Sequence, residues 1–109
     1  MRQSKINFPS SILKLEGLCY YPEGKGPFPA VALCHPHPLH GGSMESDVIM
    51  TAASALADEG IVALMFNFRG VGGSQGEFDN GSGEQEDVKA AVSWMASQKE
   101  VDKTRLGLA

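Results

Sequence analysis

The sequence is poor in cysteine, in basic charge and in long apolar runs, and each shortage excludes a class of protein. Two cysteines, Cys19 and Cys34, are too few for a disulfide framework, so we expect reduced thiols in the cytoplasm. The net charge of -4 argues against a nucleic-acid partner, which needs a basic face. No apolar run approaches the ~20 residues that span a membrane, and the N-terminus lacks the pattern of a secretory signal.

What is present indicates one globular α/β domain. The chain has 109 residues, 42% of them hydrophobic, enough for a modest core. Apolar runs and helical spacing alternate in the order β-β-β-α-β-α-β. The expected strands cover residues 5–8, 12–21, 30–34, 61–68 and the segment from 104 onward. One helix is expected from Ser43 or Ser46, either of which can cap it, to Gly60. A second is expected from Ser82 onward, with Glu84, Glu86 and Asp87 in its first turn, where acids are favourable to the helix dipole.

The strand types differ along the chain. In the strand expected at residues 12–21, Ile12, Lys14 and Glu16 alternate with Leu13 and Leu15, which indicates one face toward solvent and an antiparallel or edge position. The later strands are short, wholly apolar and separated by helices, as in a parallel sheet with right-handed crossovers. Ligands bind such sheets outside the carboxyl ends of the strands. The two unusual loops there, residues 35–44 and 69–78, are therefore expected to form one site.

The sequence of these loops resembles the α/β-hydrolase superfamily. "FNFRGVGGSQGEFDNG" is similar to the loop after the fourth core strand, with its Asp-x-Arg-Gly-x-Gly-x-Ser pattern. Asn67 stands at the Asp position, and Arg69, Gly70, Gly72 and Ser74 match. "CHPHPLHGGSM" resembles the loop after the third strand in small bacterial and archaeal members, and "DVKAAVSWM" resembles the helix before the nucleophile strand. The resemblance implies a partial α/β-hydrolase fold, mostly parallel, with an antiparallel N-terminal edge.

The same resemblance implies a Ser-His-Asp hydrolase of small esters or related acyl compounds, without a cofactor. Its nucleophile belongs in a G-x-S-x-G elbow directly after the strand that "RLGLA" begins, and acid and histidine follow later in this fold. All three fall beyond Ala109. Residues 1–109 are therefore expected to be the N-terminal part of a single hydrolase domain, ending before the elbow and inactive alone. The apolar last strand favours self-association.

Gly72–Gly76 does spell G-x-S-x-G around Ser74. The elbow requires a tight strand-to-helix turn, however, and Ser74 lies several residues beyond its strand, with the next helix signal near Ser82. The last histidine, His40, precedes it. Ser74 is therefore interpreted as a serine in a glycine-rich turn and rejected as nucleophile.

The histidine loop is interpreted as one half of an oxyanion hole, which in this fold takes an N–H from that loop. Pro36 and Pro38 have no N–H, and they stiffen the loop. Leu39 is the favoured donor among the N–H groups that remain: His37, Leu39, His40, Gly41 and Gly42.

Other interpretations of the loop are weaker. His35 and His37, with His40 or Cys34, could begin a metal site, but the chain offers no further histidine. We therefore expect no metal and a structural role for His35. Asn67, Arg69, Gly70 and Gly72 are expected to shape the second loop. A non-catalytic binding or dimerisation module is the alternative function.

Overall fold

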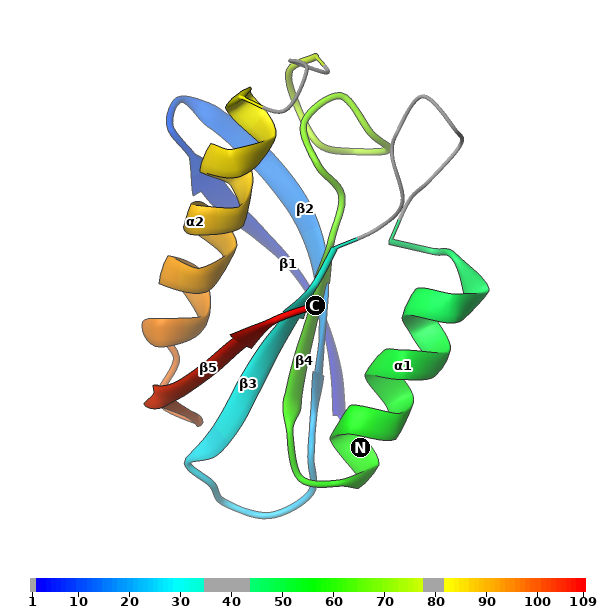
Figure 1. The fold of residues 1–109 in the computed structure, drawn as a ribbon, viewed down its shortest axis with the longest axis vertical. Helices are drawn as coiled ribbons and strands as arrows, with labels where there is room; N and C mark the ends of the chain where they lie inside the picture. The colour runs from blue at the N-terminus through cyan, green and yellow to red at the C-terminus, as the bar shows by residue number, and fades with distance from the viewer. Residues whose placement is uncertain (1, 35–43, 78–81) are drawn as a thin grey trace.

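The computed structural model describes residues 2–34, 44–77 and 82–109, and it contains the predicted order of elements (Figure 1). These are β1 (Arg2–Ser10), β2 (Leu13–Tyr21), β3 (Phe28–Leu33), α1 (Asp47–Asp58), β4 (Val62–Phe66), α2 (Ser82–Ala96) and β5 (Val101–Leu108). Neither helix in these ranges is long and apolar enough to cross a membrane.

The strands form one mixed sheet in the order β1-β2-β4-β3-β5. β2 pairs antiparallel with both β1 and β4, whereas β3 pairs parallel with β4 and with β5. The expected antiparallel N-terminal edge is therefore confirmed. Of the two possibilities left open for residues 12–21, the antiparallel one holds, while the edge position belongs to β1.

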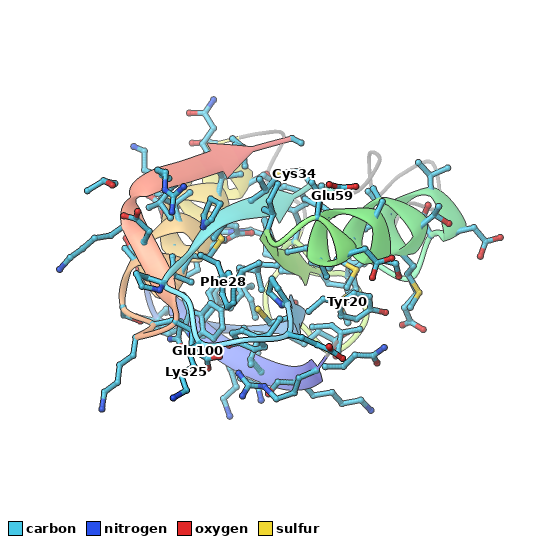
Figure 2. All side chains as sticks on the ribbon, turned by 90° about the horizontal axis from the view of Figure 1, so that it is seen from below. Tyr20, Lys25, Phe28, Cys34, Glu59 and Glu100 are labelled. Atoms are coloured by element: carbon cyan, nitrogen blue, oxygen red, sulfur yellow. The ribbon has the colours of Figure 1, made fainter. Side chains whose placement is uncertain are left out.

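Each helix covers one face of the sheet (Figure 1). Ala91 and Met95 of α2 are buried against one face, and Ala53 and Ala57 of α1 against the other. Every residue of β4 is buried, because this strand lies in the centre and is covered on both sides. Figure 2 shows Tyr20 on the side of the sheet that α1 covers.

The helix ends agree partly with the expected caps. Of the two predicted starts, Ser46 occupies the N-cap position of α1, although its side chain makes no capping hydrogen bond. Ser43, the other predicted start, lies outside the described residues. Gly60 follows the helix with a φ of +84°, and its N–H donates to the Ala57 carbonyl at 3.1 Å. The expected C-terminal stop at Gly60 is confirmed.

Candidate functional site

The carboxyl ends of the parallel strands meet at one edge of the sheet. The chain leaves β3 at Cys34 and β4 at Asn67, and parallel pairing places both exits on the same edge. The Cys34 N–H donates to the Ala109 carbonyl at 2.9 Å, and the Ala109 N–H donates to the Ala32 carbonyl at 2.9 Å. The end of β5 therefore lies directly beside Cys34, the last described residue before the histidine loop.

Most of the predicted oxyanion loop falls outside the described part of the chain. This applies to six predicted residues: His35, His37, Leu39, His40, Gly41 and Gly42. Their roles stay predictions. The chain is described again from Met44, which directly follows that segment.

Asn67 joins the two loops. Its side chain is fully buried, and its Oδ1 accepts the Met44 N–H at 2.8 Å. Its Nδ2 donates to Glu16 Oε1 of β2 at 2.5 Å. Two residues from the ends of the predicted loops are thus in direct contact, through a side chain that stands where the family pattern has aspartate.

The Glu16 carboxylate binds both Asn67 and the turn that follows it. Glu16 Oε1 also accepts the Gly73 N–H, at 2.7 Å. The neighbouring Gly72 has a φ of +54°, and a Cβ there would lie 2.5 Å from Glu16 Oε1 and 2.6 Å from Asn67 Nδ2. A side chain at position 72 would therefore displace the contact between Glu16 and Asn67.

Ser74 is engaged with backbone groups. Its hydroxyl donates to the Asn67 carbonyl at 2.6 Å and accepts the Glu16 N–H at 2.9 Å. The side chain is buried, and α2 begins only at Ser82. These hydrogen bonds attach the turn around Ser74 to β2. The turn does not connect a strand directly to a helix, as a nucleophile elbow does.

Arg69 faces the opposite way from Asn67, toward α2. Its Nη2 donates to Asp87 Oδ1 at 2.8 Å, its Nε lies 3.2 Å from both Asp87 oxygens, and its backbone N–H donates to Oδ2 at 2.9 Å. The Ser10 hydroxyl adds a hydrogen bond to Oδ1 at 2.6 Å. The hydrogen bonds that the Arg69 guanidinium donates to Asp87 raise the pKa of this guanidinium above its ordinary value. Fully buried Asp87 thus joins the loop, β1 and α2.

Sequence reasoning missed the part played by Asp87. It treated the residue as one of several acids in the first turn of α2, favourable to the helix dipole. Asp87 nevertheless stands four residues before Ala91, and Ala91 four before Met95, so all three share one buried stripe. A carboxylate on an apolar stripe needs a cationic or hydroxyl partner, and this spacing was the available signal.

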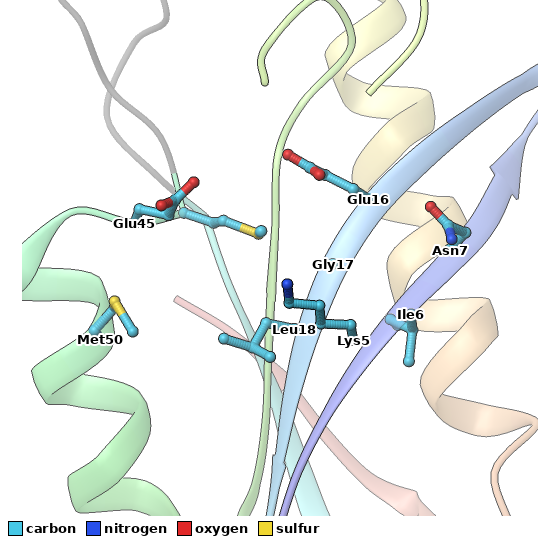
Figure 3. Close-up of a pocket in the computed structure, with 9 residues that line it drawn as sticks. Lys5, Ile6, Asn7, Glu16, Gly17, Leu18, Glu45 and Met50 are labelled. Atoms are coloured by element: carbon cyan, nitrogen blue, oxygen red, sulfur yellow. The ribbon is translucent and has the colours of Figure 1, made fainter. Parts of the chain in front are cut away.

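A cavity of about 330 Å³ adjoins the Glu16 side of this network (Figure 3). Figure 3 shows Glu45 and Met50 on its α1 side and Lys5, Leu18 and Glu16 on its strand side.

Across residues 2–34, 44–77 and 82–109, no three His, Cys, Asp or Glu side chains are grouped to hold a metal ion.

The sheet order, the covering helices and the paired loop exits define a partial α/β-hydrolase fold. The chain belongs to the X-Pro dipeptidyl-peptidase (S15) family, whose sequence model matches residues 13–109. This confirms the α/β-hydrolase resemblance.

Relatives agree with this assignment. An α/β serine hydrolase homologue from Coxiella burnetii is 39% identical, with a TM-score of 0.86 over 99% of this chain and 51% of its own. An α/β serine hydrolase without lid from Xanthomonas campestris is 35% identical, with a TM-score of 0.86 over 99% and 50%. An uncharacterized protein of Rickettsia prowazekii is 45% identical over 96 residues, 87% of this chain and 39% of that protein. The chain thus spans about half the length of these structures and less of the Rickettsia protein.

Proposed function

We propose that this chain is the N-terminal part of a cytoplasmic serine hydrolase that acts on small esters or related acyl compounds. Its part in catalysis is to supply the loop that binds the oxyanion, while the serine, acid and histidine of the triad lie outside residues 1–109. Membership of the family and similarity to serine hydrolases support this proposal. No cofactor or metal is part of it.

One observation carries the proposal. The backbone at Ala109 is hydrogen-bonded to both Ala32 and Cys34, at the end of β3. A serine that follows β5 would therefore stand next to the loop that starts after Cys34. In this fold the oxyanion is bound by the N–H after the nucleophile and by one from that loop. Donors fixed before reaction stabilise the developing negative charge without reorganisation.

The proposed roles follow the two loops. Leu39 donates its N–H to the oxyanion, and the other candidate donors are His37, His40, Gly41 and Gly42. His35 has a structural role at the start of the loop. Asn67, Arg69, Gly70 and Gly72 shape the second loop, for which the contacts of Asn67 and Arg69 give direct support.

The test uses the protein expressed from its whole open reading frame. We expect hydrolysis of p-nitrophenyl acetate and labelling by a fluorophosphonate probe, which reacts with activated serines. Leu39→Pro removes one N–H and should lower kcat by about 10²-fold or more, as loss of one oxyanion donor does. Ser74→Ala should keep turnover within about tenfold. No labelling and no hydrolysis would leave the non-catalytic binding module as the better interpretation.

The X-Pro dipeptidyl-peptidase family to which the chain belongs makes a peptidase the second candidate. An X-Pro dipeptide p-nitroanilide, assayed beside the acetate ester, distinguishes the two. Both reactions transfer an acyl group to serine and need the same oxyanion site, so Leu39→Pro should impair both. The ratio of kcat/KM for the two substrates decides between esterase and peptidase.

Self-association of residues 1–109 is proposed through the outer edge of β5. Among the described strands, β5 pairs only with β3, and Leu108 is 54% exposed. An unpaired strand edge is a template for another strand. Light scattering should find dimers or larger species; a monodisperse monomer with cooperative unfolding contradicts this.

A further inference from the structure

We propose that Glu16 and Asn67 form a positioning pair that fixes the backbone at Met44, and this inference rests on the proposed function. Met44 directly follows the segment proposed to bind the oxyanion. Its N–H is held by Asn67 Oδ1 at 2.8 Å, and Asn67 is held in turn by Glu16 Oε1 at 2.5 Å. Glu16 lies on β2, so the central sheet sets where the chain returns from the loop.

The pair requires unlike groups at its two positions. Asn67 is fully buried, and its amide offers an acceptor to Met44 and a donor to Glu16 at the same time. An aspartate there would place a second carboxylate within 2.5 Å of Glu16 Oε1, where both cannot be ionised without a large cost. Glu16 therefore explains why this chain has asparagine where the family pattern has aspartate.

The pair also joins the second loop to the first. Glu16 Oε1 receives the Gly73 N–H as well as Asn67 Nδ2, so one oxygen restrains the turn after β4 and, through Asn67, Met44. Backbone donors contribute to catalysis only when they are held near the position of the transition-state oxygen. Neither Glu16 nor Asn67 is assigned contact with substrate; both act through the backbone at Met44.

The experiment exchanges the two groups in the protein expressed from its whole open reading frame. Asn67→Asp alone should lower kcat by about tenfold or more and change KM by less than about twofold, because geometry and not substrate affinity is lost. The double variant Glu16→Gln/Asn67→Asp keeps the net charge. The aspartate at position 67 offers a carboxylate oxygen to the Met44 N–H, and the glutamine amide at position 16 supplies a donor to the same aspartate. Its kcat should return to within about threefold of wild type. Glu77→Gln, an exposed acid on the same loop, is the matched control and should change nothing.

Hydrogen exchange of the Met44 amide gives a measurement that needs no substrate. Exchange should accelerate by about tenfold or more in Asn67→Asp and slow again in the double variant. If Asn67→Asp does not fold while the double variant does, the coupling is supported, because only the exchange of groups rescues the chain.

The outcomes separate the two proposals. A wild-type protein without hydrolase activity refutes the proposed function, while Met44 exchange still decides whether the pair holds this backbone. If wild type is active and the double variant is as slow as Asn67→Asp, the positioning pair is refuted. Unchanged Met44 exchange in Asn67→Asp refutes it as well.

Discussion

The segment after β4 is attached to α2 on one side and to β2 on the other, and the two attachments differ in chemistry. On one side, Arg69 and Asp87 form a buried pair of opposite full charges, with side-chain exposures of 12% and 0%. On the other side, Asn67 and Glu16 join a neutral amide to a carboxylate. When one partner of a buried ion pair is lost, the other is left as an uncompensated buried charge. In the pair of Asn67 and Glu16, by contrast, the amide and the carboxylate can be swapped between the two positions by mutation without a change in net charge. We therefore expect the Arg69 side to govern stability and the Asn67 side to govern the geometry of the site.

The largest effect is expected from Asp87→Ala. The change removes the acceptor of four hydrogen bonds from Arg69 and one from Ser10 and leaves the guanidinium without its buried carboxylate partner. The free energy of unfolding should fall by about 3–5 kcal/mol, measured by urea denaturation. A loss below about 1 kcal/mol would contradict the stabilising role of this pair.

Glu86 is the matched control for Asp87. Its carboxylate is 3.8 Å from Arg69 Nη2, but its side chain is 62% exposed. Glu86→Gln should change the free energy of unfolding by no more than about 0.5 kcal/mol, because solvent screens such a pair. If Asp87→Ala and Glu86→Gln lowered the free energy of unfolding by similar amounts, burial would not distinguish the two carboxylates.

A smaller effect is expected from Gly72→Ala, compared with Gly60→Ala. Both glycines have positive φ, so alanine is strained at either position. At Gly60 nothing lies within 4 Å of the added Cβ, and a loss of about 1 kcal/mol is expected. At Gly72 the Cβ would also displace Glu16 from Asn67, which should raise the loss to about 2–3 kcal/mol. Equal losses in thermal unfolding would show that the pair has no influence on Gly72.

The sequence predicted the order of elements because apolar runs and helical spacing mark the buried strands and helices. It was less accurate at the edges. β1 covers Arg2–Ser10 where residues 5–8 were predicted, and β5 begins at Val101 where residue 104 was predicted. Edge strands are defined by backbone pairing with a neighbour, which polar exposed side chains do not reveal.

The candidate site was predicted unevenly. The exits from β3 and β4 share an edge because parallel pairing requires it, and this follows from the order of strands. Glu16 was assigned only to a wet face of its strand, and Asp87 only to a helix dipole. Their partners lie 51 and 18 residues away in the chain, and a single sequence does not record such contacts.

Ser74→Ala should have a moderate effect on stability and should not abolish hydrolysis. Loss of the hydroxyl leaves the Glu16 N–H and the Asn67 carbonyl without this partner, at a cost of about 1–2 kcal/mol. Loss of a true nucleophile would instead lower kcat by about 10⁶-fold. Turnover of p-nitrophenyl acetate by the whole protein, abolished in this variant, would reverse the rejection of Ser74.

The smallest effect is expected at Asp102, a carboxylate with 24% side-chain exposure that contrasts with buried Asp87. Hydrogen bonds from the Thr104 hydroxyl, the Thr104 N–H and Arg105 lower the pKa of Asp102 from its ordinary 3.8 to about 2. Since the folded state favours the ionised form, Asp102 stabilises the fold above its ordinary pKa, and this contribution disappears as the pH falls toward about 2. Wild type should therefore exceed Asp102→Asn in the free energy of unfolding at about pH 5, with the difference shrinking on acidification. A difference that is constant between these pH values would show that ionised Asp102 is not favoured by folding, and that solvent screens this carboxylate as it screens Glu86.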